Sequence, residues 1–235
     1  MQIGAFIEEM ERVAPPGIAE EFDQGRIGLV VEGTRTINRV CCALDATRSV
    51  VEQAVAMKAD MLVVHHTPIW NPVTSITGTT AGLLRPLLTS EMNLYVMHTN
   101  FDHAEGGVND ALCDLLSLKD RKSMSLGNVG RCRLTPAQIA KRLFCPLRIW
   151  GDLRTTSRLA VVAGSGFDPA LLEEAKNLGA RAFLSAEMKH SVARAAPLPC
   201  IEATHYALEA PAMRALAAER KWDYIDDPPV LNSIP

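Results

Sequence analysis

The sequence predicts an α/β fold, and three observations support that class. Apolar, strand-like runs alternate with segments of helical periodicity along the whole chain. The 235 residues, 48% of them hydrophobic, suffice for one large core or for two smaller α/β units. A weak internal repeat favours two units and is consistent with duplication.

In the first half, helices and strands follow one another in a regular order. Residues 1–13 form a predicted amphipathic helix, and an irregular segment leads into a short strand within 25–33. The further expected elements are a strand at 36–46, a helix at 47–59 with Thr47 as N-cap, a strand at 60–66, a turn-rich connection and helix within 71–92, a strand at 93–99, and a helix opened by two glycines at 106–118. This order predicts a largely parallel sheet covered by helices.

The second half repeats the alternation. Polar turn signals in residues 119–132 mark a boundary, so we expect domains at 1–125 and 126–235, with the C-terminal helix and tail packing back on the first. The expected elements beyond the boundary are a helix at 135–145 with Pro136 in its first turn, a strand at 156–166, a helix at 168–180, strands at 182–188 and 200–206, and a helix at 209–221.

Composition narrows the range of functions. A net charge of −3 provides no basic stripe for a phosphate backbone, which argues against nucleic acid as the main partner. No apolar run reaches the roughly 18 residues of a membrane helix, and the first helix carries acids where a signal peptide carries bases. The six cysteines lack CxxC spacing, so we expect reduced thiols in the cytoplasm. Adjacent Cys41 and Cys42 lie in a strand-like run and are expected in the core.

Two adjacent histidines, His65 and His66, stand where the apolar run of "VVHHTPIW" (63–70) stops. In parallel α/β sheets, ligands bind beyond the carboxyl ends of the strands, so both side chains are expected at such a site. Adjacent residues of a regular strand point to opposite faces. For both histidines to serve one site, the strand must already turn there, and Pro68 favours that ending.

The internal repeat adds three more polar residues. "KADMLVVHH" and "GARAFLSAE" each lead into a helix and a second strand, and in each second strand a histidine precedes a carboxylate by four residues. One such histidine is more often a hydrogen-bonded surface group, but five metal-competent side chains at corresponding strand ends favour a site. Three imidazoles and two carboxylates can hold two divalent metals that share a bridging carboxylate. The candidate ligands are His65, His66, Asp102, His205 and Glu209.

The segment "MHTNFDHAEGGVNDAL" (97–112) adds further candidates. Glu105 is an acid, and His98 and His103 are potential proton carriers. Gly106 and Gly107 allow close backbone approach to a ligand before a helix whose N-terminus can hold an anion. The alternative is an ordinary loop in which Asn109 or Asp110 caps the helix. "AGSGFDP" (163–169) lacks the dinucleotide fingerprint and is expected to be a turn, with Asp168 as N-cap and Pro169 at the first helical position.

These motifs resemble a known family. "ADMLVVHHTPIW", "HTNFDHAEGGVNDAL", "GARAFLSAEMKH" and "ATHYALE", followed by "YIDDPP", are similar in order and content to the NGG-one-interacting-factor-three-like (Nif-three-like) dinuclear metal proteins. Bacterial members of that family are labelled GTP cyclohydrolase I type 2. The likeness runs from "GRIGLVVEG" through the closing segment. The family's metal ligands match the same five residues that the strand-end argument selects.

The resemblance implies a fold, an assembly and a chemistry. It implies two α/β domains facing each other across a cleft with a dinuclear metal site, and a homohexamer built as a ring of dimers. It also implies a compact form, because the inserted domain of longer relatives is missing. Ser191 stands where the family usually has a second histidine after "EMKH", so the role of that imidazole is in doubt.

The expected function is metal-dependent hydrolysis of a small, nucleotide-like substrate, with GTP as the substrate that the label implies. His98 or Glu105 would then move protons, and the substrate contacts would come from His103, Gly106, Gly107, Glu187 and His190. The alternative is a non-catalytic carrier of iron or another metal for cofactor biosynthesis, and an adaptor for other proteins has only the family's name in its favour. The donor set favours iron or zinc and tolerates manganese or cobalt.

Overall fold

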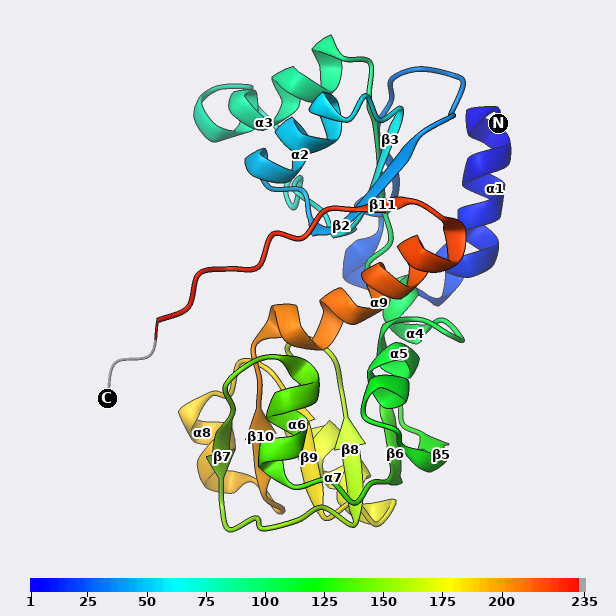
Figure 1. Cartoon of the computed structure of the whole chain (residues 1–235). Helices are drawn as coiled ribbons and strands as arrows, with labels where there is room; N and C mark the ends of the chain where they lie inside the picture. Colours follow the sequence, from blue (N-terminus) through cyan, green and yellow to red (C-terminus); the bar gives the residue numbers. More distant parts are fainter. Residues whose placement is uncertain (233–235) are drawn as a thin grey trace. The chain divides into compact units, whose positions relative to one another are not determined.

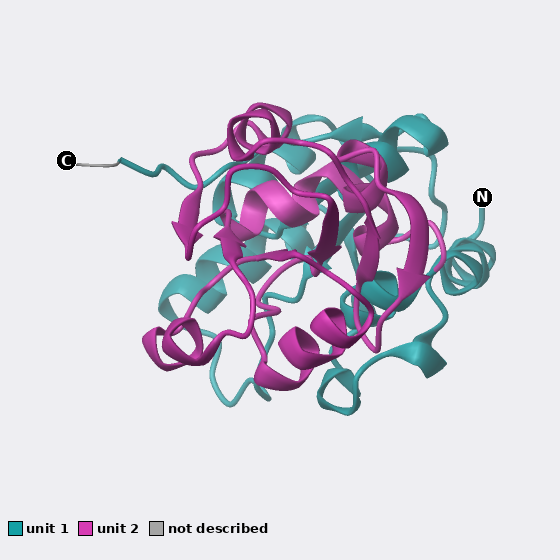
Figure 2. Cartoon of the chain, turned by 90° about the horizontal axis from the view of Figure 1, so that it is seen from below, with its two compact units in different colours: residues 1–104, 213–235 teal, residues 105–212 magenta. Residues whose placement is uncertain are grey.

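The computed structural model describes residues 1–232, and their contacts divide the chain into two compact units (Figure 2). Unit 1 comprises Met1–Ala104 together with the chain from Met213 onward, and unit 2 comprises Glu105–Ala212. The expected domains were 1–125 and 126–235, of which 233–235 lie outside the described residues. The units therefore divide earlier than expected, and the chain returns to unit 1 near its end.

Unit 1 is built on a five-stranded sheet with the strand order β1-β4-β3-β2-β11 (Figure 1). The strands are β1 (Gly28–Val31), β2 (Val40–Asp45), β3 (Met61–His66), β4 (Asn93–Val96) and β11 (Asp223–Tyr224). All neighbouring pairs are parallel except β1 with β4. The prediction of a largely parallel sheet is correct for this unit.

Helices cover both faces of this sheet. The elements concerned are α1 (Ile3–Val13), η1 (Pro16–Ile18), η2 (Glu21–Asp23), α2 (Arg48–Ala56), α3 (Gly78–Thr89) and α4 (Thr99–His103). Helices α2 and α3 bury their apolar residues against one face, which includes Leu62 and Leu94. On the other face, Phe6 of α1 packs edge-on against Tyr95 of β4, with ring centroids 6.0 Å apart. The expected first helix is confirmed, and its buried residues are Phe6 and Met10.

The two adjacent cysteines belong to this core, as expected. Cys41 and Cys42 lie in β2 and are fully buried, and Cys42 Sγ donates to the carbonyl of Met213. Burial raises the pKa of Cys41 to about 11 and raises that of Cys42 further. Both thiols are therefore protonated near neutral pH and serve as apolar packing groups.

Unit 2 contains a six-stranded sheet with the order β5-β6-β8-β9-β10-β7. The strands are β5 (Lys119–Ser123), β6 (Asn128–Arg131), β7 (Arg148–Trp150), β8 (Arg158–Val161), β9 (Ala182–Ser185) and β10 (Cys200–Glu202). Only the pairs β8–β9 and β9–β10 are parallel, and the other pairs are antiparallel. The sheet of this unit is thus mixed, although the second half repeats the alternation of strands and helices that predicted a largely parallel sheet in the first.

The reason is the segment that sequence reasoning treated as a boundary. Residues 119–132 form the hairpin β5–β6, whose second strand pairs with β8 along the whole length of Asn128–Arg131. Their polar composition suits an edge: every residue of β5 is at least partly exposed. A charged edge strand resists pairing with another chain, and it looks like a turn in the sequence.

The helices of unit 2 are α5 (Val108–Leu115), α6 (Pro136–Leu143), α7 (Pro169–Asn177), α8 (His190–Ala195) and the start of α9 (His205–Arg220). Figure 1 shows α6 on one face of the sheet and α7 on the other. The α7 side of the core includes Leu172, Ala175 and Phe183.

Local signals predicted the starts of α2, α6 and α7 correctly. Thr47 caps α2 by accepting from the backbone N–H of Val50, and Pro136 occupies the first turn of α6 behind a capping box. Asp168 caps α7. The expected turn at "AGSGFDP" is thus confirmed.

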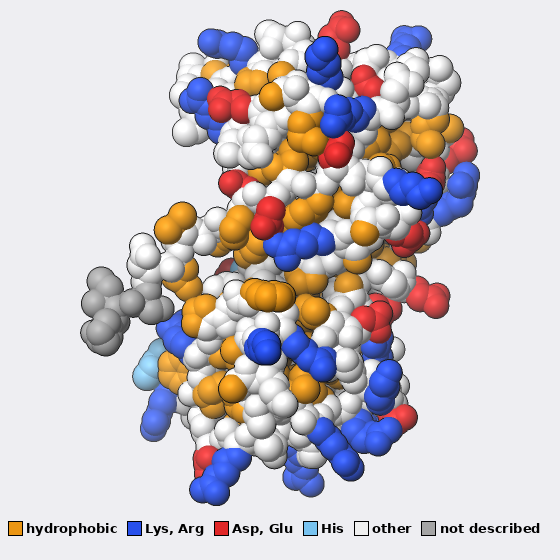
Figure 3. All heavy atoms as spheres, viewed as in Figure 1, with side chains coloured by type: hydrophobic (Ala, Val, Ile, Leu, Met, Phe, Trp, Pro, Cys, Tyr) orange, Lys and Arg blue, Asp and Glu red, His pale blue; other side chains and the backbone are white. Residues whose placement is uncertain are grey.

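Charge is divided unevenly between the units. Acidic residues outnumber basic ones in unit 1, and the reverse holds in unit 2, where lysine and arginine side chains are spread over the face seen in Figure 3. Acidic side chains lie between them. No helix among residues 1–232 has both the length and the apolar content needed to cross a bilayer.

Candidate metal-binding residues

Three histidines of unit 1 come together at the carboxyl ends of β3 and β4. The candidate ligand atoms of His65, His66 and His98 all lie within 4.8 Å of one another. The ring centroids of the adjacent pair are 4.9 Å apart, so both histidines do face the same site. Pairing of β3 with β4 stops at Val64, and this frees the last two residues of β3 on that side.

Each of the three rings is held through its Nδ1 atom. His65 Nδ1 lies 2.7 Å from the carbonyl oxygen of Met97, and because a carbonyl can only accept, Nδ1 carries the hydrogen. Nε2 is then the nitrogen with the lone pair, which is the form in which a neutral imidazole binds a divalent metal. His65 is also fully buried, so its ring has one fixed orientation.

His66 is held by a carboxylate that sequence reasoning missed. Its Nδ1 lies 2.7 Å from Asp45 Oδ1. Asp45 is the last residue of β2 and stands directly opposite His66 in the parallel register. The signal was therefore present in the sequence, as an acid at the end of a predicted strand, but only the register showed its partner. Such a carboxylate fixes the tautomer of a histidine and raises its basicity.

His98 is held by a second missed carboxylate, Asp23. Both carboxylate oxygens lie within hydrogen-bond distance of His98 Nδ1, at 2.8 and 2.9 Å, and Asp23 is fully buried. Thr99 also donates to Asp23 through its backbone N–H and its hydroxyl. Burial alone would raise the pKa of Asp23, but the hydrogen bonds from Thr99 and His98 hold it below its ordinary value. Asp23 lies in η2, in a segment expected to be irregular, so no local pattern pointed to it.

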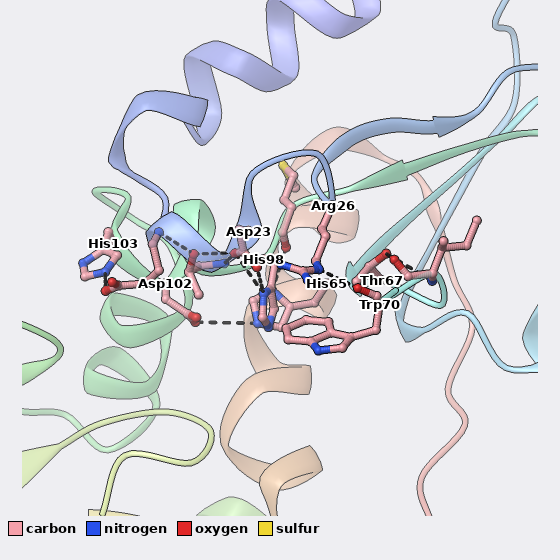
Figure 4. A network of polar contacts seen from close by, with 12 residues as sticks. Asp23, Arg26, His65, Thr67, Trp70, His98, Asp102 and His103 are labelled. Carbon is pink, nitrogen blue, oxygen red and sulfur yellow. Dashed lines mark hydrogen bonds and ion pairs between the residues drawn. The ribbon is translucent and has the colours of Figure 1, made fainter. Parts of the chain in front are cut away.

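Asp102 completes the group in unit 1. It lies in α4, four residues after His98, and its Oδ1 is 3.6 Å from His65 Nε2 (Figure 4). His103, in contrast, stands apart from the three clustered histidines and pairs with Glu20 at 2.8 Å. The structure thus brings together His65, His66, His98 and Asp102, which we call the unit 1 donor group.

The remaining expected ligands form a second group in unit 2. His205 and Glu209 lie one turn apart at the start of α9, and His205 Nε2 is 2.9 Å from Glu209 Oε2. His205 was expected at the end of a strand over 200–206, but β10 stops at Glu202 and the helix begins at His205. The spacing of four residues places both side chains on one face of the helix, which suits ligands of one site.

The ring of His205 is held in the same way as the others. Its Nδ1 lies 2.7 Å from Glu187 Oε1, so Nε2 faces Glu209. Glu187 was expected to contact substrate, and the structure gives it this orienting contact. We call His205, Glu209 and Glu187 the unit 2 donor group.

The glycine turn of unit 2 packs directly under this group. Gly164 has φ +66°, and a Cβ at that position would overlap Glu209 Oε1 and lie 3.3 Å from His205 Nε2. The turn at "AGSG" therefore also packs against two expected ligands, His205 and Glu209, which the sequence did not predict.

The other expected site residues lie at the surface or at helix starts. Glu105 and His190 are exposed, and His190 is the first residue of α8. Gly107 is the N-cap of α5, and the N–H of Gly106 donates to Asp110 Oδ2 at 2.9 Å. Their roles toward a substrate stay predictions.

The fold and the donors define the class of this protein. It is an α/β protein with two sheets that carries groups of histidine and carboxylate side chains able to hold metal ions. The family model described as Duf34/NIF3 (NGG1p interacting factor 3) matches residues 1–223, and the chain belongs to that family, which confirms the resemblance.

Individual relatives agree with this assignment. A protein of Pyrococcus abyssi named GTP cyclohydrolase 1 type 2 homolog is 35% identical over 83% of this chain and 84% of its own length. A Streptomyces coelicolor protein of the same name is 31% identical over 89% of this chain and 82% of its own. The solved structure of reduced HcgD from Methanocaldococcus jannaschii superimposes with a TM-score of 0.82 at 26% identity, over 96% of this chain and 97% of that one.

Proposed function

We propose that this protein binds two divalent metal ions and uses them to hydrolyse a small, nucleotide-like substrate. The observation that carries the proposal is the shared arrangement of the four imidazoles. Each places Nδ1 against an oxygen, from Met97, Asp45, Asp23 or Glu187. This pattern is typical of metal-binding histidines, and it leaves Nε2 as the ligand atom of His65, His66 and His205 and as the proton-accepting nitrogen of His98.

The donor set suits such ions. Neutral imidazole nitrogens and carboxylate oxygens are ligands for iron, zinc, manganese and cobalt, and we favour iron or zinc. The proposed ligands are His65, His66, Asp102, His205 and Glu209, so the proposal requires the two donor groups to act together. When bound, two such ions supply Lewis-acid chemistry for hydrolysis.

The chain's own residues have distinct roles in this proposal. Met97, Asp45 and Glu187 orient His65, His66 and His205. His98 is oriented by Asp23, whose buried carboxylate lies against Nδ1 and would pair with the charge of an imidazolium if Nε2 accepted a proton from the substrate. That arrangement favours His98 over the exposed Glu105 as the proton carrier. GTP is the substrate that the relatives' names suggest.

The test is metal content per subunit by elemental analysis, on untagged protein and on the variants His65→Ala and Glu209→Ala. We expect close to two ions in the wild type and a clear loss in each variant. Glu173→Ala serves as control, because Glu173 is an exposed acid that pairs with Lys176 on α7. Variants that fold normally and keep the full wild-type metal content would contradict the proposed ligands.

The lability of the bound metal ions distinguishes a hydrolase from the metal-carrier alternative. His66 keeps a quarter of its side chain exposed, which gives a chelator access to that ligand. A hydrolase should keep its ions under mild chelation and show GTP turnover that follows metal content. Easy loss of one or both ions without turnover would favour the carrier.

A further inference from the structure

Two large aromatic side chains are exposed beside the clustered histidines of unit 1. Phe22 is 50% exposed and Trp70 is 45% exposed, although aromatic residues make up only 5% of the chain. Phe22 directly precedes Asp23, which holds His98, and Trp70 follows His66 by four residues. Two separate segments therefore bring an exposed ring to the same place.

The two rings and His98 form one cluster, which we call the aromatic corner. The Phe22 and Trp70 centroids are 6.1 Å apart, and both lie close to His98, at 6.3 and 5.8 Å. Figure 4 shows Trp70 beside the histidines. Both rings meet His98 edge to face, and the Phe22 and Trp70 rings are tilted by 47° to each other, which leaves ring surface open to solvent.

Arg26 fixes the position of Trp70. Its Nε donates to the Trp70 carbonyl at 2.6 Å, and its guanidinium carbon lies 4.9 Å from the centroid of the indole ring. The backbone and the ring of Trp70 are thus both held by one cation. Because the exposed Trp70 ring is already held in place, little further conformational entropy is lost when a ligand stacks on it.

Trp70 also lines a pocket within unit 1. The pocket has a volume of about 650 Å³ and lies between the loop that follows β3 and the start of α3. That volume is typical of small-molecule sites. Several of its lining residues can bind hydroxyl or phosphate oxygens, and they are Arg48, Asn71, Thr74, Ser75, Thr79 and Thr80.

We infer that the aromatic corner and this pocket form a ring-stacking subsite for a ligand with a flat heteroaromatic ring and a polar, anionic tail. The ring stacks on Trp70 with Phe22 beside it, and the tail enters the polar pocket. This subsite deepens the proposed function, on which it rests, because it would hold a planar substrate next to the unit 1 donor group.

The test compares two probes that share a phosphate and differ in the ring. Calorimetric titration with guanosine 5′-monophosphate and with ribose 5-phosphate is carried out on metal-loaded and on chelator-treated protein. We expect the nucleotide to bind more tightly, and Trp70→Ala to weaken its binding by about ten-fold or more, the loss expected for one stacked base. Phe22→Ala should act in the same direction, and Trp70→Phe should restore most of the affinity.

Phe144→Ala is the matched control, because Phe144 is 91% exposed and lies in unit 2. It should bind like the wild type, and every variant should keep wild-type metal content. The inference is overturned if the nucleotide does not bind, if ribose 5-phosphate binds equally well, or if Trp70→Ala changes subunit association and leaves affinity unchanged.

The titration tests the subsite alone, whereas the metal content of His65→Ala tests the proposed function. If His65→Ala keeps its metal, the proposed function fails, but ring-dependent binding to chelator-treated protein can still be observed.

Discussion

At the scale of single residues, the most informative groups are the acids that hold the histidines. His65, His66, His98 and His205 were all found from the sequence, because their spacing is a local pattern. Asp45 and Asp23 were not, because each meets its histidine through a distant contact, 21 and 75 residues away along the chain. Two predictions concern these acids.

Asp23→Asn should lower the free energy of unfolding of the metal-free protein by about 1–3 kcal/mol at pH 7, since it breaks a buried, charge-assisted hydrogen bond. The pKa of Asp23 is lower in the folded than in the unfolded protein, where it is about 3.9. The stability that the charged Asp23 side chain contributes is therefore fully present above its pKa in the unfolded protein. It is lost as the pH falls through its pKa in the folded protein. Urea unfolding should show the gap between wild type and variant narrowing below about pH 4. A gap that is constant with pH would contradict this.

Asp45→Asn should weaken metal binding by about 10- to 100-fold, because it removes the carboxylate that orients His66 and raises its basicity. The measurement is a competition titration with a chelator of known zinc affinity. Asp152→Asn is the control, since Asp152 is exposed. Equal affinities of the two variants would show that Asp45 does not support a metal ligand.

At the scale of elements, the ends of strands and the starts of helices decide where the donors lie. His98 is the N-cap of α4 and His205 is the first residue of α9, and each precedes its carboxylate by one helical turn. Sequence reasoning recognised the spacing of four but extended the strand at 200–206 too far. A short strand followed at once by a helix has too few residues for its period to be seen.

Gly164→Ala should both destabilise unit 2 and reduce its metal content. The left-handed φ alone costs about 1 kcal/mol for a residue with a Cβ. The added methyl would also push Glu209 away from His205. Gly25→Ala is the matched control, with φ +75° and no neighbour within 4 Å of its Cβ position. Urea unfolding and elemental analysis should show a similar strain in both variants and a loss of metal in Gly164→Ala alone.

At the scale of the whole molecule, the chain forms two α/β units, and the second begins and ends inside the first along the sequence. The C-terminal segment returns to unit 1, where β11 pairs with β2 and Arg214 pairs with Asp226. Helix α9 contributes His205 and Glu209 to unit 2 before its later residues join unit 1. The division at 104 and 212 therefore reflects hydrogen bonding of distant segments, which composition cannot reveal.

The assembly stays a proposal. We expect a ring of six subunits, as the family resemblance implies, and light scattering on purified protein should give close to six times the subunit mass. Dilution should not dissociate it readily if dimers build the ring through extensive interfaces. A monomeric mass would contradict the ring while leaving each unit's donor group unaffected.

The sequence by itself determined the α/β class, most helix starts, the buried cysteines and the histidines and carboxylates that are candidate metal ligands. All of these depend on short-range patterns: period, capping residues and motif spacing. Only the tertiary structure decided the mixed sheet of unit 2, the acids behind His66 and His98, and the exposed rings of Phe22 and Trp70 beside the histidines. These features depend on strand register and on contacts between segments far apart in the chain. A local pattern cannot encode them, because the partner that fixes each one lies elsewhere in the sequence.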